Sequence, residues 1–598
     1  MIPKTKIQLL LLLLAYTLTG LAQTSQQTYK EAYDLNFTMA YTPNIVYPWL
    51  ENAAYANSAE SVFLEEAHRT FFAKAYYTDA PLSDKLQTEL EQRIILPSAK
   101  GKEAVIRLET KGYNIRQATM TIQALNAQEQ VLRTEVCTFS VDTMLTRASK
   151  NIDISSAEML NIQINAVGKN LQEAFLAFSA LDIIIDGQSI RQLPIRQPSP
   201  IHLNRANIHT PINLQTARPW SRLQALKNKK IIGLGESIHG NTSLQNMAYD
   251  YILHAVENQN ARLILLEMPF ERALAYNRYI QDERYRLDSS FVQAYPSVSF
   301  LNRLRSFNRN RPAKNKVKIY GMDYNYMLTK QQNTAMDIFD FIATINPKAE
   351  NQHLNQLLVL LTQEDKRLAT QFIQTHQQQL TPVLSTEEQA SIAHILQLST
   401  DMGASLVKRF QLRDSVMYAN AHFLIDNYAK EPTTQVVVYG HGVHINTSST
   451  YPAVATTPLG GYMHQTYGQS YHPLTLLVGE GSTTAYNEEM QMVEAPLTAS
   501  PAGSIEDVLK QISAPAFYLP FTPEFNRIAL TRFKGSSHIH QEFYPFNLYQ
   551  RFKGAFFIRR SAKDNTEKQV VNTTQPSQQF AKKLKQRQEI LRLVREKK

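Results

Sequence analysis

The stretch Lys230-Ile231-Ile232-Gly233-Leu234-Gly235-Glu236-Ser237-Ile238-His239-Gly240 is the part of this chain from which the rest can be interpreted. Two isoleucines followed by closely spaced glycines predict the end of a short buried strand and then a sharp turn. Glu236 and His239 are three residues apart in the sequence, and the turn should bring both side chains just beyond the carboxyl end of the strand. Ligands bind at this edge in open α/β sheets. A carboxylate beside an imidazole suits general-base catalysis, although a plain turn before a capped helix gives the same pattern.

Three further apolar runs also end in reactive side chains. Leu263-Ile264-Leu265-Leu266-Glu267 ends in a carboxylate, Ile319-Tyr320-Gly321-Met322-Asp323 in another, and Val436-Val437-Val438-Tyr439-Gly440-His441-Gly442-Val443-His444 in two histidines. Burying an unpaired charge is costly, so strand packing alone does not explain these side chains. If the strands are parallel, all four ends meet at one edge of a sheet, and we expect one shared site there.

The patterns on either side of the opening stretch divide the chain into an all-β part and an α/β part. Alternation at 105–110, 118–124, 160–166 and 181–187 predicts an antiparallel, jelly-roll-like β-sandwich over residues 28–198. Residues 199–225, rich in proline, arginine and asparagine, are expected to form a linker. Residues 226–560 are expected to form an α/β domain with a mostly parallel sheet flanked by helices.

Strand–helix alternation is the basis for that α/β domain. We expect strands at 230–235, 262–267, 317–321, 434–440, 473–479 and 516–520, and helices at 243–257, 269–283 and 332–345. Residues 349–430 interrupt the alternation with leucines and isoleucines at helical spacing, which predicts a helical cap inserted into the domain. Strands at 527–533 and 554–559 are expected to complete it.

The N-terminal residues 1–22 have the composition of a signal peptide. Lys4 and Lys6 precede a short apolar run, and small residues come before Gln23. We therefore predict export, to the periplasm or the medium, and no later stretch is apolar and long enough to predict a membrane span. The single cysteine, Cys137, excludes an internal disulfide.

The C-terminal residues 561–598 carry much of the chain's formal charge of +10, with ten lysines and arginines against four acidic residues. This composition predicts a basic tail that is a solvated helix or disordered. Because an exported protein rarely meets nucleic acid, we predict no nucleic-acid partner.

The reactive side chains favour hydrolysis by an activated water molecule. The G-x-S-x-G elbow of serine hydrolases is absent, and Cys137 lies in the predicted sandwich. We expect His239 to take the proton of the water and Glu236 to hold the imidazole or the water. Glu267 would hold or polarise the water from the other side, and His441 or His444 would donate to the oxyanion.

Two alternatives to this hydrolase stay open. Two histidines with two or three carboxylates also suit zinc or manganese, so a metal-dependent hydrolase is possible on the same scaffold, although the H-E-x-x-H signature is absent. A non-catalytic glycan-binding protein is the second alternative. Aromatic residues of the sandwich would form either its core or a sugar-stacking face; they are Trp49, Phe71, Phe72, Tyr76 and Tyr77.

Taken together, the motifs of the α/β part resemble those of the erythromycin esterase family. They are the opening Gly233–Gly240 stretch, Glu267 at a strand end, Gly321-Met322-Asp323, Arg413-Asp414-Ser415-Val416-Met417-Tyr418-Ala419-Asn420, Gly440-His441-Gly442-Val443-His444, Pro458-Leu459-Gly460-Gly461-Tyr462-Met463 and Tyr467-Gly468. The motifs occur in the order of the family. The resemblance covers about residues 205–535 and leaves the sandwich outside it.

This resemblance implies an α/β core with a helical cap and a deep cleft. It implies hydrolysis of a macrolide lactone, a small-molecule ester, by activated water and usually without an obligatory metal, so we expect no cofactor. The matching residues are His239 as the base, Glu236 and Glu267 as essential carboxylates, and His441 and His444 as cleft histidines. We expect Asp323, Arg413 and Asn420 to bind substrate.

Two positions depart from the family pattern. Gly442 stands where the family commonly has asparagine, and Ser243 stands where it commonly has glutamate. These departures leave the water-activating set intact, and they leave open whether the substrate is a macrolide or another ester.

Overall fold

The structure is a computed structural model of the 598-residue chain. It describes residues 28–38, 49–52, 55, 58–66, 69–78, 83–97, 101–196, 212–214, 220, 223–289, 291, 295–325, 332–363, 366–401, 406–448, 457–486, 491–533, 543–562 and 574–597. The predicted signal peptide lies outside these residues, as does most of the predicted linker. Among the described residues, no helix is both long and apolar enough to cross a membrane.

The N-terminal domain is a β-sandwich of two antiparallel sheets, as predicted. One sheet is ordered β1 (Leu50–Glu51), β4 (Gln87–Ile95), β9 (Met159–Gly168), β6 (Ile115–Leu125), β7 (Val131–Phe139). The other is ordered β2 (Glu60–Glu66), β3 (Arg69–Tyr76), β10 (Ala174–Ile185), β5 (Glu103–Tyr113), β8 (Thr146–Asp153), with β11 (Gln188–Ser189) paired to β10. Alternate residues such as Ile106 and Leu108 on β5 are buried between the sheets, which is why the period-two pattern is clear in the sequence.

The aromatic residues considered for a sugar-stacking face belong mainly to the sandwich interior. Trp49, Phe71, Phe72 and Tyr76 are buried, and Tyr77 alone of the five is exposed. The Trp49 ring stacks on Phe37, and its indole N–H donates to the Asp34 carbonyl at 2.8 Å. These residues therefore stabilise the domain and do not form a common stacking surface.

The C-terminal domain is built on one eight-stranded sheet, mostly parallel as predicted. Its order is β12 (Ile212–Asn213), β20 (Ala516–Pro520), β23 (Gly554–Arg560), β17 (Tyr471–Glu480), β13 (Ile231–Glu236), β16 (Gln435–His441), β14 (Ala261–Pro269), β15 (Lys318–Asp323). The six strands from β23 to β15 are parallel, and β20 is antiparallel to both of its neighbours. The edge strand β12 comes from the segment predicted to be a linker, so part of that segment belongs to the sheet.

Helices cover both sides of this sheet. Those of the core alternation are α3 (Gln224–Lys227), α4 (Thr242–Asn258), α5 (Phe270–Gln281), α6 (Val298–Asn308) and α7 (Thr334–Ile345). The predicted insert is helical, with α8 (Gln352–Leu361), α9 (Lys366–Thr375), α10 (Gln377–Leu380), α11 (Thr386–Asp401) and α12 (Leu406–Tyr428). Helix α11 packs against α5 and α7, whereas α12 runs along β14 and β15.

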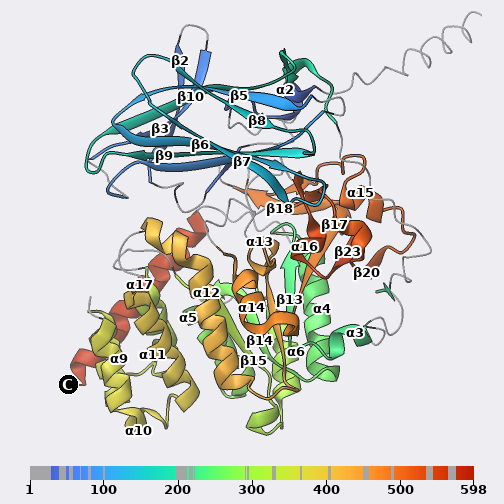
Figure 1. The fold of residues 1–598 in the computed structure, drawn as a ribbon. Helices are drawn as coiled ribbons and strands as arrows, with labels where there is room; N and C mark the ends of the chain where they lie inside the picture. Colours follow the sequence, from blue (N-terminus) through green and yellow to red (C-terminus); the bar gives the residue numbers. More distant parts are fainter. Residues whose placement is uncertain are drawn as a thin grey trace, which may run out of the picture.

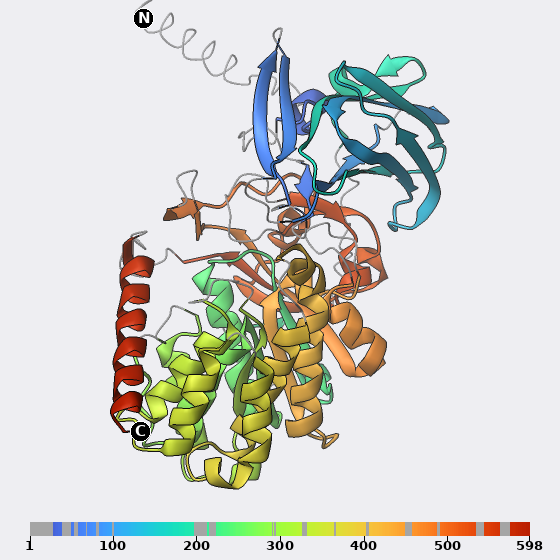
Figure 2. The ribbon, with the colours of Figure 1, turned by 90° about the vertical axis from the view of Figure 1, so that its left-hand side faces the viewer.

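Further short elements complete the domain. They are α13 (Gly442–Ile445), α14 (Leu459–Tyr467), the hairpin β18 (Ser482–Tyr486) and β19 (Met492–Pro496), α15 (Ile505–Leu509), the hairpin β21 (Ala529–Arg532) and β22 (Phe543–Phe546), and α16 (Leu548–Arg551). The sandwich sits over the end of the α/β domain on which α13 lies, and both ribbon views show this placement (Figures 1 and 2).

The described part of the basic C-terminal segment is a helix, α17 (Thr574–Glu596), which was one of the two predicted forms, but one side of it is docked on the α/β domain and is not solvated. Figure 2 shows it lying along the outside of the α/β domain, next to other helices. It packs against α7 and α8. Val594 is buried, and Arg587 donates to both carboxylate oxygens of Asp340 at 2.6 and 2.8 Å. The positive charge that suggested solvation is thus partly neutralised by acidic residues of α7.

Candidate active site

The carboxyl edge of the parallel sheet brings the predicted reactive residues together. Strand β16 lies between β13 and β14, and Glu236 is directly opposite His441 in the register of β13 and β16. Glu267 lies near the carboxyl end of β14, on the other side of β16. Because all three strands run in the same direction, their ends converge, as the apolar runs predicted.

Glu236 and His239 form a hydrogen-bonded pair on the turn after β13. The Nδ1 atom of His239 is 2.5 Å from Oε1 of Glu236, and the Tyr439 hydroxyl donates to Oε2 at 2.6 Å. Glu236 is buried, whereas the His239 side chain is 32% exposed. With the Nδ1 proton donated to Glu236, the Nε2 atom of His239 is the nitrogen able to accept a proton.

The environment of His239 shifts its proton affinity upward. Burial on its own lowers the pKa of the imidazole, but the hydrogen bond and charge of Glu236, with the charge of Glu267, raise the pKa above its usual value. A raised pKa makes the imidazole a stronger base once it is deprotonated.

The turn that carries His239 is fixed by strand β18. The Thr483 hydroxyl donates to the His239 carbonyl at 3.0 Å, and the Thr484 amide donates to the Gly240 carbonyl at 3.1 Å. Gly240 has φ of +74°, and a Cβ there would lie 2.0 Å from the Thr484 carbonyl oxygen. Glycine is therefore required by both the backbone conformation and the close approach of the two segments.

His441 faces His239 across the edge of the sheet. The two ring centroids are 4.5 Å apart with 44° between the ring planes. The Val443 amide donates to Nδ1 of His441 at 3.3 Å, which favours the tautomer that carries its proton on Nε2. His441 is thus suited to donate a hydrogen bond, while its neighbour His239 is suited to accept a proton.

Both carboxylate oxygens of Glu267 have protein partners. The His441 amide donates to Oε2 at 2.6 Å, the Arg413 guanidinium donates to Oε1 at 3.0 Å, and Nε2 of His444 lies 3.3 Å from Oε1. Burial alone would raise the pKa of Glu267, but the charges of His444, His239 and Arg413 hold it well below its usual range. Glu267 is an anion that fixes the positions of its cationic neighbours.

His444 bridges two carboxylates and is a cation in the neutral pH range. Its Nδ1 atom is 2.8 Å from Asp414, and its Nε2 atom faces Glu267. Burial lowers the pKa of His444, but the charges of Asp414 and Glu267 outweigh this effect and raise it to about 10. With both ring nitrogens donating within the protein, His444 is a poorer oxyanion donor than His441.

The predicted substrate-binding residues separate into two groups. Arg413 donates to Asp323 from Nε at 3.1 Å and from Nη2 at 2.6 Å, and its side chain is 25% exposed at the edge of the site. Asn420 is instead fully buried. It donates to the Met322 carbonyl at 2.8 Å, and its side-chain oxygen meets the His394 ring. We therefore place Asn420 in the scaffold that joins α12 to β15.

Three residues of this cluster were not selected from the sequence. Tyr439 supports Glu236, Asp414 supports His444, and Phe533 packs against His441 with ring centroids 5.3 Å apart. Tyr439 lies in the motif selected for His441 and His444, and Asp414 lies in the motif selected for Arg413. Phe533 lies about 90 residues after His441, and no sequence spacing connects it to the site.

Within the described part of the chain, no three histidine, cysteine, aspartate or glutamate side chains are arranged to hold a metal ion. The acidic and imidazole groups instead pair with one another or with Arg413 and Tyr439. The arrangement combines a base in His239, a hydrogen-bond donor in His441 and a network of fixed charges, and such a set suits attack by an activated water molecule.

Comparison with known proteins gives one sequence-family match and several distant structures. The family described as erythromycin esterase matches residues 256–561, a region that begins within α4, after Glu236 and His239. No curated protein matches the chain. A solved Bacillus cereus protein is 17% identical with a TM-score of 0.46, covering 58% of this chain and 95% of its own.

Two further solved structures are similar to different parts of the chain. An erythromycin esterase mutant in its open conformation is 15% identical with a TM-score of 0.40, covering 58% of this chain and 95% of its own. A carbohydrate-binding module in complex with β-1,4-galactotriose is 13% identical with a TM-score of 0.19, covering 26% of this chain and 96% of its own.

Proposed function

The chain belongs to the erythromycin esterase family, and from this premise we propose that it is an exported hydrolase that cleaves carboxylic esters with a water molecule activated by His239. The observation that carries the proposal is the pairing of Glu236 with His239 at 2.5 Å, with the His441 ring 4.5 Å away. A base held by a carboxylate next to a hydrogen-bond donor suits attack by water on an acyl carbon.

The proposed reaction has two steps. Nε2 of His239 takes a proton from water as the water oxygen attacks the acyl carbon, and the Nε2–H of His441 donates to the resulting oxyanion. The tetrahedral intermediate then collapses, the C–O bond of the ester breaks, and the His239 imidazolium gives its proton to the leaving alkoxide. The products are a carboxylic acid and an alcohol, and Glu236 stabilises the imidazolium between the two steps.

The test is a panel of esters that includes a 14-membered macrolide, read by mass spectrometry for the gain of one water. We expect at least one ester to be cleaved, and we expect His239→Ala to lose about 10²–10⁴-fold in turnover while it folds normally, since that is the usual contribution of a general base. Full activity in the His239→Ala variant would contradict the proposed mechanism. The metal-dependent alternative predicts instead that turnover is lost after chelation.

We propose further that the sandwich contacts a glycan. Outside its main core, the Tyr113 and Phe175 rings stack with centroids 5.9 Å apart and 17° between planes, and Tyr113 is 43% exposed. The exposed Tyr113 ring, supported by the half-buried Phe175 ring, suits stacking against a sugar ring. Binding of the whole protein to a glycan array, weakened by Tyr113→Ala, would support this proposal, and equal binding by the variant would contradict it.

A further inference from the structure

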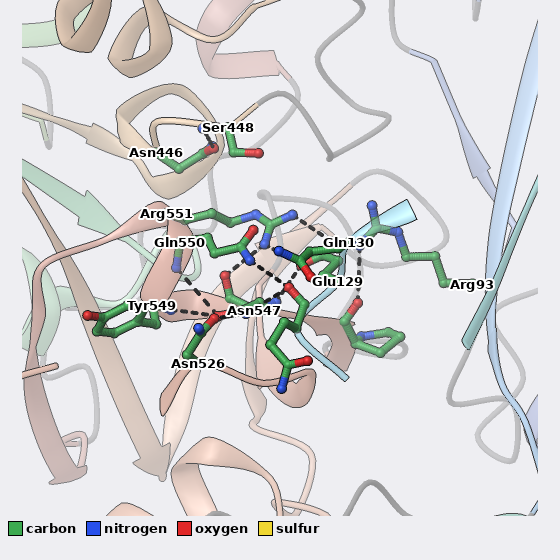
Figure 3. Close-up of polar contacts among 12 residues, drawn as sticks. Arg93, Glu129, Gln130, Asn446, Ser448, Asn526, Asn547, Tyr549, Gln550 and Arg551 are labelled. Carbon is green, nitrogen blue, oxygen red and sulfur yellow. Dashed lines mark hydrogen bonds and ion pairs between the residues drawn. The ribbon is translucent and has the colours of Figure 1, made fainter. Parts of the chain in front are cut away.

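The two domains meet at a buried ionic cluster around Glu129. The turn between β6 and β7 places Glu129 between two arginines, Arg551 of α16 and Arg93 of β4 (Figure 3). Arg551 donates to Oε2 at 2.6 Å and to Oε1 at 2.7 Å, and Arg93 donates to Oε1 at 2.6 Å. The side chains of all three residues are less than 10% exposed. Such a cluster fixes a geometry, because removal of one member leaves a buried charge without compensation.

Backbone contacts complete the junction. The Asn547 amide donates to Glu129 at 2.7 Å, and Arg93 donates to the Pro545 carbonyl at 3.3 Å. Glu129 itself has φ of +67°, a left-handed backbone conformation that residues other than glycine and asparagine seldom adopt. A glutamate is thus held in an unfavourable backbone conformation at the one point where its carboxylate reaches both arginines.

The same junction includes the hairpin of β21 and β22. Leu530 of β21 is part of the hydrophobic core of the sandwich, and Ile528 packs with Leu125 and Met159 of that domain. The Ile528 amide donates to the Ala127 carbonyl at 2.6 Å. The hairpin therefore belongs to the α/β domain by sequence but is anchored in the sandwich.

The end of β21 reaches the catalytic edge. Phe533, directly after β21, packs on His441 and meets Phe546 edge-on with centroids 5.0 Å apart. A Cβ on Gly442 would lie 2.6 Å from the Phe533 ring, so the glycine leaves the space that the ring occupies. His441 is consequently enclosed by the His239 ring, the Phe533 ring and the Val443 amide.

A second connection runs from the cluster to the loop after α13. Arg551 and Gln550 accept through their carbonyls from Thr447, whose amide lies 3.3 Å from the Arg551 oxygen and whose hydroxyl lies 3.0 Å from the Gln550 oxygen. Thr447 is three residues beyond His444. His441 and His444 are thus both joined to the Glu129 cluster through short segments of the α/β domain.

We propose that the sandwich helps to set the geometry of the active site. Glu129 positions the β21–β22 hairpin, and through this hairpin Phe533 sets the orientation of the His441 ring. Phe533 and Glu129 are positioning residues, since both act through His441. This inference rests on the proposed function for one point, the expected effect on kcat, which requires that His441 donates to the oxyanion. The structural coupling between Glu129 and His441 does not depend on the proposed function.

The test uses the full chain labelled with ¹³C-histidine and three variants. Glu129→Gln weakens the cluster with little change in shape, while Phe533→Leu and Gly442→Ala disturb the contact between Phe533 and His441 and leave the ion pairs of Glu129 in place. The control is Glu135→Gln, which removes a solvent-exposed ion pair with Lys150 on the same sandwich. The His441 signal is assigned by its loss in His441→Gln, and folding is followed by circular dichroism.

We expect the His441 ring signal to shift in all three variants and to stay in place in Glu135→Gln. On the cleaved ester, kcat should fall on the order of 10–100-fold with KM nearly unchanged, since a small misplacement of a catalytic group has an effect of this size. An unshifted His441 signal and unchanged kcat in folded Glu129→Gln would overturn the proposal. If the wild-type protein cleaves no ester, the proposed function fails, and the His441 signal still decides the coupling.

Discussion

At the scale of single residues, one carboxylate and one phenol determine what His239 can do. Glu236 accepts from both His239 and Tyr439, so the imidazole is held in one orientation and one tautomer. This arrangement is the reason that a half-exposed histidine on a turn can act as a base of defined geometry. His441 and His444 are fixed by different partners, the Val443 amide and Asp414.

The charge of Glu236 gives the first prediction. Because that charge raises the pKa of His239, Glu236→Gln should lower the pKa and move the acid limb of kcat/KM to lower pH. The plateau of kcat/KM should also fall by about 10²-fold or more, since the imidazolium formed in the reaction loses its counter-ion. An NMR titration of His239 checks the shift, with the exposed Glu257→Gln on α4 as the control. A pKa equal to or above that of the wild type would contradict the assignment.

His444 gives a second prediction, on stability. Its pKa is raised by folding to about 10, so the stability that its charge contributes is fully present below about pH 6.5 and is lost as the pH rises toward 10. The free energy of unfolding should therefore decline between pH 7 and 10, by at most about 1.4 kcal/mol per pH unit for this proton.

Urea unfolding of His444→Gln at pH 7, 8 and 9 checks this expectation. The variant should be less stable than the wild type at pH 7 and should show a flatter dependence on pH across the window. His422→Gln, a half-exposed histidine of α12, serves as the control and should keep the wild-type slope. A wild-type slope in His444→Gln would show that His444 is not the titrating group.

At the scale of elements, the site is assembled from strand ends and from segments that clamp them. Strands β13, β14 and β16 supply Glu236, Glu267 and His441 at one edge. Helix α12 adds Arg413 and Asp414 from the side, and the hairpin of β18 and β19 fixes the turn after β13. The parallel sheet brings the three side chains to one edge, and the contacts from α12 and the β18–β19 hairpin hold them in position.

The contact between that turn and β18 is testable at Gly240. Gly240→Ala combines an unfavourable φ of +74° with a Cβ that would lie 2.0 Å from the Thr484 carbonyl, so the turn must move. We expect a loss of about 1–3 kcal/mol in the free energy of unfolding and a fall in kcat, because His239 moves with the turn.

Gly187→Ala is the matched control for this change. Gly187 has a similar φ of +80°, but its Cβ would have no atom within 4 Å. Its substitution should cost less stability and leave turnover unchanged. Equal effects of the two substitutions would show that backbone conformation alone, and not the contact with β18, makes Gly240 necessary.

At the scale of the whole molecule, two parts distant in sequence complete the α/β domain. The sandwich is anchored through Glu129 and the β21–β22 hairpin, and the C-terminal helix α17 packs on the helical side (Figure 2). Neither part carries a predicted catalytic residue. Each buries charged groups against the domain, so each is part of its stability.

Helix α17 gives the last prediction. Arg587→Ala removes the buried partner of Asp340, and the cost of an uncompensated buried charge is about 3–5 kcal/mol, with Lys583 at 3.3 Å from Asp340 placing the value near the lower end. The melting temperature should fall clearly. Arg592→Ala removes an exposed arginine from the same helix and should leave it nearly unchanged. Equal melting temperatures for the two variants would show that the docking of α17 contributes little.

From the order of residues alone, we could predict a sandwich followed by an α/β domain, the parallel core strands, the helical insert and the convergence of acidic and imidazole groups. Period-two alternation and apolar runs are local signals, and parallel strands bring their ends together once they are recognised. Glu236, His239, Glu267, His441 and His444 could therefore be selected from the order of residues along the chain.

The chemistry open to each of those residues depends on contacts that the order of residues does not reveal. Whether a histidine accepts a proton or stays charged depends here on neighbours from distant segments: Asp414 for His444, and Tyr439 for the Glu236 that holds His239. The burial of Asn420 and the docking of α17 are likewise set by what packs on them. No local pattern encodes such partners, because contacts between distant segments are selected by the folded chain as a whole.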